Sequence, residues 1–444
     1  MRITRLIGLL GLALVHVSFA QNARVVWPLD ASTLPGIYDE DFPPSVNPLQ
    51  RSAAQQRVID ANAAGDYATA GREGIAVLAN EKPDDELRLI IANSLAWTGK
   101  LKEAAPAYLS LTRGPFANEA NVGLGNINRW RGRDDQAIPF YHSVLTNNPG
   151  NAGALEGLEL ATRELSPRTL VNFGGLSDSS DLQRRSNSIN HRWRDASGVH
   201  LFEVEMGSVR DALPASNASQ QEVTARYQGL DLPLKPSVEI SLSNKTDQAL
   251  YGSLRVSFLD DRVTIGTGRV NWAKLATNPN ALSAGLSAKY LGATVAQSVS
   301  IGQFTGNIDY YDISDGNSML TSRANFNSGW RPFGSRYKPY IGIETRTARF
   351  NTPNYWSPDQ GSGTAYTGLL GEWGAADWSL FASAQLGTRL YGDAGNGWSV
   401  SGGGKRWLTN DIAMSMNLWA MDSWRDNSKY KAQSLNVNLE KLWR

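Results

Sequence analysis

This chain has few of the side chains that most often bind metals or act as nucleophiles and bases. The sequence has no cysteine and only four histidines, of which His16 lies in an apolar N-terminal run and His142 in a helical segment. That leaves His191 and His200, too few for a histidine-rich metal site. The Gly-Xaa-Ser-Xaa-Gly and His-Glu-Xaa-Xaa-His signatures of hydrolases and zinc proteases do not occur. The sequence therefore predicts no metal and no cofactor.

Glu203 and Glu205 come closest to a paired-carboxylate site. Two carboxylates can share acid and base work on a glycosidic bond. These two are separated by one residue in a segment of alternating polarity, so both would project from the same face of one strand. We expect them to line a wet channel rather than to catalyse a reaction, and we predict that the protein is not an enzyme.

The segments that carry these charges alternate between apolar and polar residues throughout residues 166–444. For example, Val238, Ile240 and Leu242 alternate with small or charged residues. Such one-sided alternation means that one face of the strand meets an apolar medium and the other meets water. At about 17 residues for each strand with its turn, this region holds roughly 16 strands, enough to close a barrel around an aqueous lumen. We predict a C-terminal antiparallel transmembrane β-barrel over 166–444; a soluble propeller or sandwich is the alternative.

The polar faces of these predicted strands carry charges of both signs. A lumen of mixed charge suits a weakly charged, hydroxyl-rich polymer better than it suits a pore for ions of one sign. The alternative is that these charges only keep the channel hydrated. The candidate substrate-binding residues are Glu203, Glu205, Glu239, Arg255, Asp309, Arg323, Glu344, Arg346 and Arg389.

Aromatic residues recur near the ends of the predicted strands. Membrane barrels carry girdles of such residues at the two lipid–water interfaces. The sequence predicts that the girdles are formed by Trp330, Tyr337, Tyr340, Trp356, Trp373, Trp378, Trp398, Trp407, Trp424 and Trp443.

A repeat of 33 or 34 residues occupies residues 52–165. Gly65, Gly99 and Gly132 recur at spacings of 34 and 33, and the alanines five residues after each follow the same spacing. Prolines at positions 83, 115 and 149 close the three units. This pattern resembles the tetratricopeptide repeat, a helix-turn-helix unit that stacks into a solenoid and binds proteins or peptides on its concave face. We expect three units and a capping helix, Ala152–Leu165.

The N-terminus has the form of a secretory signal. Arg2 and Arg5 precede the apolar run Leu6–Val17, and Ala20 would end a cleavable segment of residues 1–20. Residues 21–51 are rich in proline and are expected to form a linker or arm. No run of 18 apolar residues follows, so no membrane-spanning helix is expected. The formal net charge of +1 and the absence of a basic stripe indicate no nucleic-acid partner.

A signal segment, tetratricopeptide-like repeats and a C-terminal barrel in one chain resemble the exopolysaccharide export porins of Gram-negative bacteria. The similar types are the poly-N-acetylglucosamine exporter, the outer-membrane subunit of cellulose synthase and the YaiO-like barrel proteins. The string Asn354-Tyr-Trp-Ser-Pro358 adds to the resemblance. The large exporters have many more repeats than the three found in this chain.

The resemblance implies a division of labour between the two parts. The repeats would lie in the periplasm and dock periplasmic or inner-membrane secretion and synthase subunits. The barrel would sit in outer-membrane lipid and conduct an exopolysaccharide chain. The alternative is an outer-membrane anchored scaffold, or a surface receptor, with a closed barrel.

Overall fold

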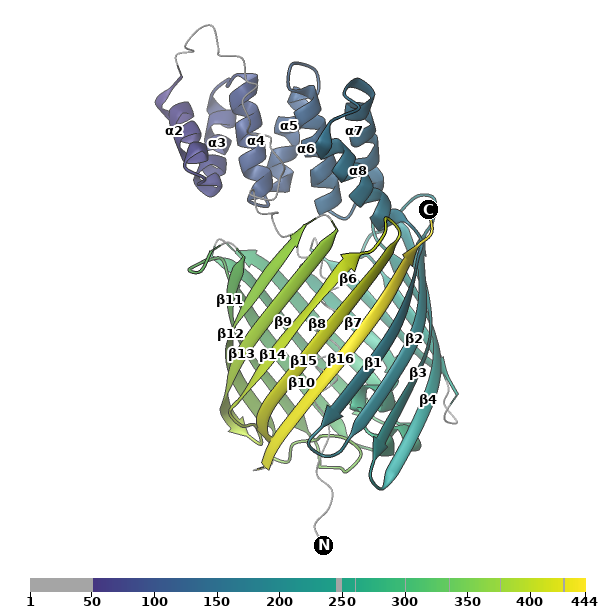
Figure 1. Ribbon diagram of the computed structural model, residues 1–444. Coiled ribbons are helices and arrows are strands. Elements are labelled where there is room, and N and C mark those ends of the chain that lie inside the picture. The colour runs from purple at the N-terminus through teal and green to yellow at the C-terminus, as the bar shows by residue number, and fades with distance from the viewer. Residues whose placement is uncertain are drawn as a thin grey trace. The chain divides into compact units, whose positions relative to one another are not determined.

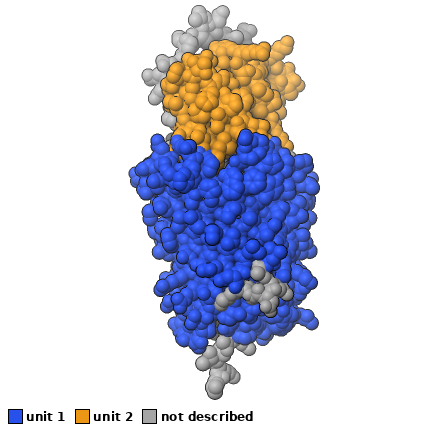
Figure 2. Space-filling view, turned by 90° about the vertical axis from the view of Figure 1, so that its right-hand side faces the viewer, with its two compact units in different colours: residues 1–19, 166–444 blue, residues 20–165 orange. Residues whose placement is uncertain are grey.

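The computed structural model describes residues 51–444 apart from 245–249, 260, 300, 335, 376 and 426–427. The described residues form two compact units, an N-terminal unit that ends at Leu165 and a C-terminal unit that begins at Ser166 (Figure 2). The predicted signal segment, 1–20, and nearly all of the predicted arm, 21–51, lie outside the described residues. No helix in the described part of the chain has the length and apolarity needed to cross a membrane.

Seven helices in a row build the N-terminal unit. They are α2 (Ala53–Ala63), α3 (Tyr67–Asn80), α4 (Asp85–Trp97), α5 (Leu101–Leu111), α6 (Ala117–Trp130), α7 (Asp134–Asn147) and α8 (Ala152–Leu165). Each helix contacts the next, and α2, α4, α6 and α8 also contact one another in succession. This is the stacking of a solenoid of helical hairpins, and it confirms the predicted repeat architecture.

The helix boundaries follow from local chemistry. Ser52, Asp66 and Asp84 cap α2, α3 and α4, since each side chain accepts a hydrogen bond from a backbone N–H in the first helical turn. Gly65 and Gly99 have φ values of 73° and 77°, a left-handed conformation that glycine adopts without strain. The repeat of glycines in the sequence is therefore a repeat of turns.

Close packing between helices depends on small residues. A Cβ atom at Gly123 would lie 2.5 Å from the ring of Tyr108, and one at Gly125 would lie 2.5 Å from the ring of Tyr141. Each tyrosine hydroxyl in turn donates to an asparagine fifteen positions earlier, Tyr108 to Asn93 and Tyr141 to Asn126. The same contact recurs in successive units, as expected for a repeat protein.

Sixteen antiparallel strands close into a barrel in the C-terminal unit (Figure 1). Each strand pairs with its neighbours in sequence, and β1 pairs with β16 to complete the circle. The strands are β1 (Arg168–Asp178), β2 (Gln183–Arg194), β3 (His200–Leu213), β4 (Ser216–Gly229), β5 (Ser237–Ser243), β6 (Leu250–Phe258), β7 (Val263–Val270), β8 (Ala288–Val299), β9 (Gly302–Ile313), β10 (Ser318–Ser328), β11 (Tyr337–Ala348), β12 (Ser362–Ala375), β13 (Trp378–Gly392), β14 (Gly397–Trp407), β15 (Ile412–Arg425) and β16 (Ser428–Leu442). This confirms the predicted fold class.

The two faces of the barrel wall differ in polarity. On each strand alternate residues point outward, and on fifteen of the sixteen strands, all but β12, they include exposed large apolar side chains, among them Phe173, Met206, Ile240, Leu291, Ile341 and Leu418. A belt of this kind would be unfavourable in water and is favourable against lipid chains. The outer surface is therefore that of a barrel built to sit in a bilayer.

The predicted aromatic girdle is wrong at three positions. Trp407 pairs in register with Ala413 on the inward face, and the Nζ of the inward Lys405 lies 4.6 Å from its ring centre. Tyr340 points into the barrel, where its hydroxyl donates to Gln385. Trp356 is buried in the loop between β11 and β12, with the guanidinium of Arg346 4.9 Å from its ring centre. Period-two alternation reports a side chain's face only within a strand, and Trp356 lies in a folded loop. Trp330, Trp398, Trp424 and Trp443 are exposed.

Helical structure also occurs within the barrel unit, where the sequence predicts none. The segment between β7 and β8 contains two short helices, α9 (Trp272–Ala276) and α10 (Pro279–Ala284). Asn271 and Asn278 cap them, since each side chain accepts a backbone hydrogen bond from the start of its helix. Helices of five and six residues are too short to show a helical period in the sequence.

Candidate functional site: the barrel lumen

All nine charged residues predicted for the lumen lie on the inward face of the sheet. Strand register establishes this, because residues directly opposite across a strand pair share a face. Glu203 pairs in register with Arg226, which pairs with Glu239, and Arg323 pairs with Glu344. The same alternation places the remaining five, Glu205, Arg255, Asp309, Arg346 and Arg389, on that face.

Three of the predicted carboxylates converge on one guanidinium. Arg226 donates to Glu205 at 2.8 Å, to Glu239 at 2.6 Å and also to Glu203. Opposite charges at this range stabilise one another and fix the side chains in place. Sequence reasoning placed the three glutamates on a common face but missed Arg226, although it lies in a segment of the same alternating character.

Tyrosines and arginines share the wall built by β8 to β12. Tyr290 donates to Asp309 at 3.0 Å, and Arg323 donates to the hydroxyl of Tyr366 at 2.8 Å. The Arg323 guanidinium also lies 5.1 Å from the centre of the Tyr366 ring and 4.0 Å from Glu344. Charges on this side of the lumen are thus held by aromatic and acidic neighbours.

Arg389 is not brought together with the other candidates. It lies exposed near the turn between β13 and β14, and its backbone N–H donates to Asn396. The structure therefore does not gather the nine candidates into a single site. Seven fall in two groupings, one around Arg226 and one on β8 to β12, and Arg255 lies on β6 between the strands of these two groupings.

The rest of the lumen wall has an uncharged middle. Strands β13 to β16, β1 and β2 present amides and hydroxyls there, and we call this set the amide wall. Its members bond to one another across strands, as Ser383 does to Ser401 at 2.7 Å and Asn438 to Ser415 at 3.1 Å. The amide wall comprises Asn172, Ser186, Ser188, Asn190, Ser383, Gln385, Ser399, Ser401, Ser415, Asn417, Ser434, Asn436 and Asn438.

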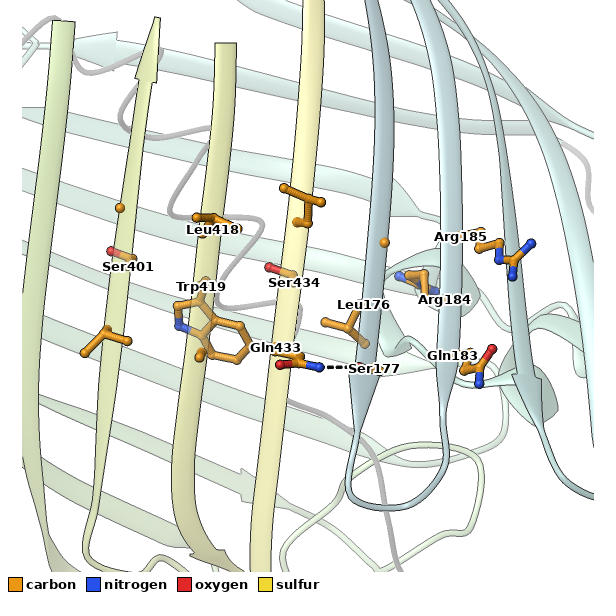
Figure 3. A pocket seen from close by; sticks show the side chains of 15 residues that line it. Leu176, Ser177, Gln183, Arg184, Arg185, Ser401, Leu418, Trp419, Gln433 and Ser434 are labelled. Atoms are coloured by element: carbon orange, nitrogen blue, oxygen red, sulfur yellow. Dashed lines mark hydrogen bonds between the residues drawn. The ribbon is translucent and has the colours of Figure 1, made fainter.

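Two aromatic residues, Trp419 and Phe381, point inward among these amides and hydroxyls, and Trp419 has the larger ring. Trp419 pairs in register with Ser401 and Ser434 and packs against Leu176 and Leu182. A cavity of about 630 Å³ lies against these strands, and its lining includes Ser401, Trp419, Ser434 and Leu176 (Figure 3). An indole ring surrounded by hydroxyls and amides can contact the apolar face of a sugar ring while its neighbours bond the ring hydroxyls.

Two long loops fold into the lumen, and together we call them the lumen insert (residues 271–287 and 349–361). The ring of Trp272 lies 5.4 Å from that of Tyr355, and Asn278 donates to the carbonyl of Pro353 at 3.0 Å. Their apolar residues pack with inward residues of strands on either side, including Val209 on β3 and Met319 on β10. The insert therefore narrows the passage through the barrel.

A buried ion pair fastens the insert to the wall. Arg184 and Asp211 join β2 to β3 through two hydrogen bonds of 2.6 and 2.7 Å, and their side chains are 6% and 0% exposed. Arg184 also donates to the carbonyl of Lys274 and to the hydroxyl of Thr277, both at 3.0 Å. A charge buried this deeply needs its partner, so the ion pair is a structural anchor. Sequence reasoning missed it because each residue looks like any other lumen charge.

No grouping of three or more histidine, aspartate or glutamate side chains suited to a metal ion occurs among the described residues. The features present are a closed transmembrane barrel, a polar lumen with an insert, and a helical-repeat module. They define a class of protein that combines a membrane barrel with a helical-repeat module.

Comparisons with known proteins find matches among solved structures. The sequence matches no family model and no curated protein. Among solved structures, a bacterial polysaccharide outer-membrane secretin is 11% identical, covering 63% of this chain and 99% of its own, with a TM-score of 0.49. A BenF-like porin from Pseudomonas fluorescens Pf-5 is 9% identical over 63% of this chain and 98% of its own, with a TM-score of 0.36.

The helical part has its own match. The second tetratricopeptide domain of human RPAP3, solved in complex with an HSP70 peptide, is 19% identical over 24% of this chain and 92% of its own, with a TM-score of 0.23. Identities and scores this low do not identify a substrate or a partner, which must be inferred from the residues of this chain.

Proposed function

We propose that this protein is an outer-membrane porin for the export or assembly of an exopolysaccharide. The amide wall is the observation that carries the proposal. Its amides and hydroxyls can exchange hydrogen bonds with the hydroxyls of a passing sugar chain, and each such contact is weak enough to release. Trp419 adds an aromatic face within the same wall.

The charged parts of the lumen support the same substrate class. Arg226 compensates the glutamates around it, and Arg323 lies beside Glu344 and Tyr366. Internal pairing of this kind leaves little free charge of one sign to select small ions. A weakly charged, hydroxyl-rich polymer fits such a lumen better than a small ion does.

The helical module would lie in the periplasm and dock partner proteins. Stacked helical hairpins form an extended concave surface that suits protein or peptide partners. We propose that the partners are periplasmic or inner-membrane secretion and synthase subunits that bring the polymer to the barrel. Polymer synthesis at the inner membrane would then drive transport.

A second candidate function follows from the lumen insert. Two loops joined to each other and anchored by Arg184 and Asp211 could close the passage. In that case the barrel would serve as a membrane anchor for the helical module, either as a scaffold or as part of a surface receptor. The two candidates differ in whether the channel conducts.

Single-channel conductance in a planar bilayer tests both candidates. The refolded protein is compared with a variant in which residues 272–286 are replaced by a short glycine-serine linker. The export proposal expects conductance from the unaltered protein and blockade of that conductance by one polysaccharide out of a panel. A correctly folded, heat-modifiable protein that conducts only after removal of the insert would favour the anchored scaffold.

A variant of the amide wall tests the proposed contact surface. Replacing Asn417 and Asn436 with leucine removes amide groups at the centre of the wall, where the two residues pair in register. We expect polymer blockade to weaken about tenfold or more while small-ion conductance changes little. The matched control replaces Leu418 and Leu435, the outward neighbours in the same strands, with valine; equal blockade in the wall variant and the control would contradict the proposal.

A further inference from the structure

Two arginines face each other on the outside of the barrel. Arg184 and Asp211 point inward and pair with one another, so their neighbours Arg185 and Arg210 point outward. The register of β2 and β3 places Arg185 directly opposite Arg210, and both side chains are exposed. Figure 3 shows Arg184 and Arg185 in succession on β2.

Such a pair is unfavourable by itself. Like charges directly opposite across two strands destabilise the sheet. The outward residues beside them in register are Gly175 on β1 and Ser219 on β4, which cannot compensate a charge. Within the described part of the chain neither guanidinium has a hydrogen bond or an ion pair.

Two other outward cations that lie on paired strands have acidic neighbours. Lys289 lies 3.8 Å from Asp312, and Lys431 lies 3.7 Å from Asp422. Arg406 on β14 is also outward and exposed, but it faces Trp378 and Met414 rather than a second cation. The Arg185–Arg210 pair places two guanidiniums side by side without an acid, and it therefore calls for an anion from outside the protein.

The position of the pair relative to the apolar belt indicates what that anion is. Toward the middle of the wall the next outward pair is Asn187 and Ser208, and beyond it come the exposed apolar residues Ile189 and Met206. Lipid chains would cover the apolar residues, so the arginines lie where headgroups begin. Two guanidiniums side by side match the oxygens of a phosphate, which arginine binds through paired N–H donors.

We propose that Arg185 and Arg210 bind a phosphate group of an outer-leaflet glycolipid. The strands run from one rim, where β1 begins at Arg168 and β16 ends at Leu442, to the opposite rim, and the arginines lie in the half nearer the opposite rim. The assignment to the outer leaflet rests on the proposed function, which places the helical module, and with it the start of β1, on the periplasmic side. The phosphate site itself does not depend on export.

Lipid binding to the full-length protein in detergent tests the site. Native mass spectrometry would be used to titrate bisphosphorylated lipid A, its dephosphorylated form, phosphatidylglycerol and inorganic phosphate. We expect R185Q/R210Q to bind bisphosphorylated lipid A about tenfold more weakly than the unaltered protein does. The control K289Q, which removes an outward cation that has an acidic neighbour, should bind it unchanged.

A second variant, R185E, separates loss of lipid binding from loss of stability. R185E gives Arg210 a carboxylate partner, so it should lose glycolipid binding without lowering the unfolding temperature. Binding of bisphosphorylated lipid A to R185E or R185Q/R210Q as tight as to the unaltered protein would overturn the site. Equally tight binding of phosphatidylglycerol would overturn the choice of the outer leaflet. Polymer blockade is measured separately, so failure of the export proposal would leave this result intact.

Discussion

The two parts of this molecule bury opposite kinds of residue. The helical module encloses apolar side chains such as Leu87, Ile91 and Leu95, all 0% exposed. The barrel exposes its apolar side chains and encloses charges, with Asp211 at 0% and Ile240 at 51% exposure. Both arrangements keep apolar surface away from water. Lipid chains cover the apolar side chains of the barrel, whereas neighbouring helices cover those of the module. The same substitution should therefore have different effects in the two parts.

The largest effect is expected where the barrel buries a charge. D211N leaves Arg184 without its ion-pair partner in a buried position and should destabilise the barrel by about 3–5 kcal/mol. It should also release the lumen insert, since Arg184 holds Lys274 and Thr277. Urea unfolding of the protein in lipid vesicles, followed by heat-modifiable electrophoresis, measures the change.

The control for this substitution is D312N, which removes an exposed carboxylate 3.8 Å from Lys289. We expect it to change stability by less than about 1 kcal/mol. If D211N and D312N unfold alike, the buried pair is not an anchor.

A cavity in the helical module should have nearly as large an effect. I91A removes a fully buried side chain that packs against Gly74, where an added Cβ atom would lie 2.6 Å from it. We expect a loss of about 2–5 kcal/mol, seen as faster hydrogen exchange in α3 and α4 of the full-length protein. The matched substitution I240A on the lipid face should change stability by about 0.5 kcal/mol or less. Comparable losses at both positions would break the comparison.

On the lipid face, a charged substitution should destabilise the barrel more than truncation of an apolar side chain does. I240R places a guanidinium at the centre of β5, on the outward side, and should cost about 2–4 kcal/mol in a bilayer. Unfolding in lipid vesicles of matched thickness measures the cost. Tolerance of arginine there would mean that the outer belt does not face lipid.

The smallest effect concerns a helix cap in the module and depends on pH. The pKa of Asp66 lies below its ordinary value because the backbone N–H and the hydroxyl of Thr69 donate to its carboxylate. The cap therefore stabilises α3 fully above the ordinary pKa of about 3.9, and this contribution is lost as the pH falls through the lower folded-state pKa. D66A should cost about 1 kcal/mol at pH 7 and less in acid.

D66N separates the cap from its charge. Asparagine caps helices about as well as aspartate does, so D66N should retain most of the stability at pH 7 and lose the pH dependence. Hydrogen exchange in α3 at pH 7 and in acid would measure both variants. A D66N variant as unstable as D66A would show that the charge, rather than the hydrogen bond, stabilises the helix.

Periodicity explains how much of the fold could be predicted. A glycine every 33 or 34 residues fixes turns, and alternation between lipid and water fixes strands, so both parts could be recognised from local patterns. The same alternation placed nine lumen charges on the correct face, while their role in binding substrate stays a prediction. The ion pairs of Arg226 with three glutamates depend on strand register. Hairpin length sets the register, whereas the period of two tells only which face a side chain occupies.

Contacts between loops could not be predicted from these patterns. Trp272 and Tyr355 meet inside the barrel although 83 positions separate them in the chain, and no local pattern connects the segments that carry them. The pairing of the outward Arg185 and Arg210 could not be predicted either, because it too depends on strand register.

The attachment points of the lumen insert have a consequence for the order of assembly. The hydrogen bonds and packing contacts that hold the insert come from β2 to β4, from β7 to β11 and from the turn after β13, together with its own two loops. None of these contacts involves the last three strands, β14 to β16. A curved, still open sheet that ends just after β13, at Asp393, already contains all of these partners. The lumen insert can therefore pack against its strands before β16 pairs with β1. It does not have to be threaded into a closed barrel.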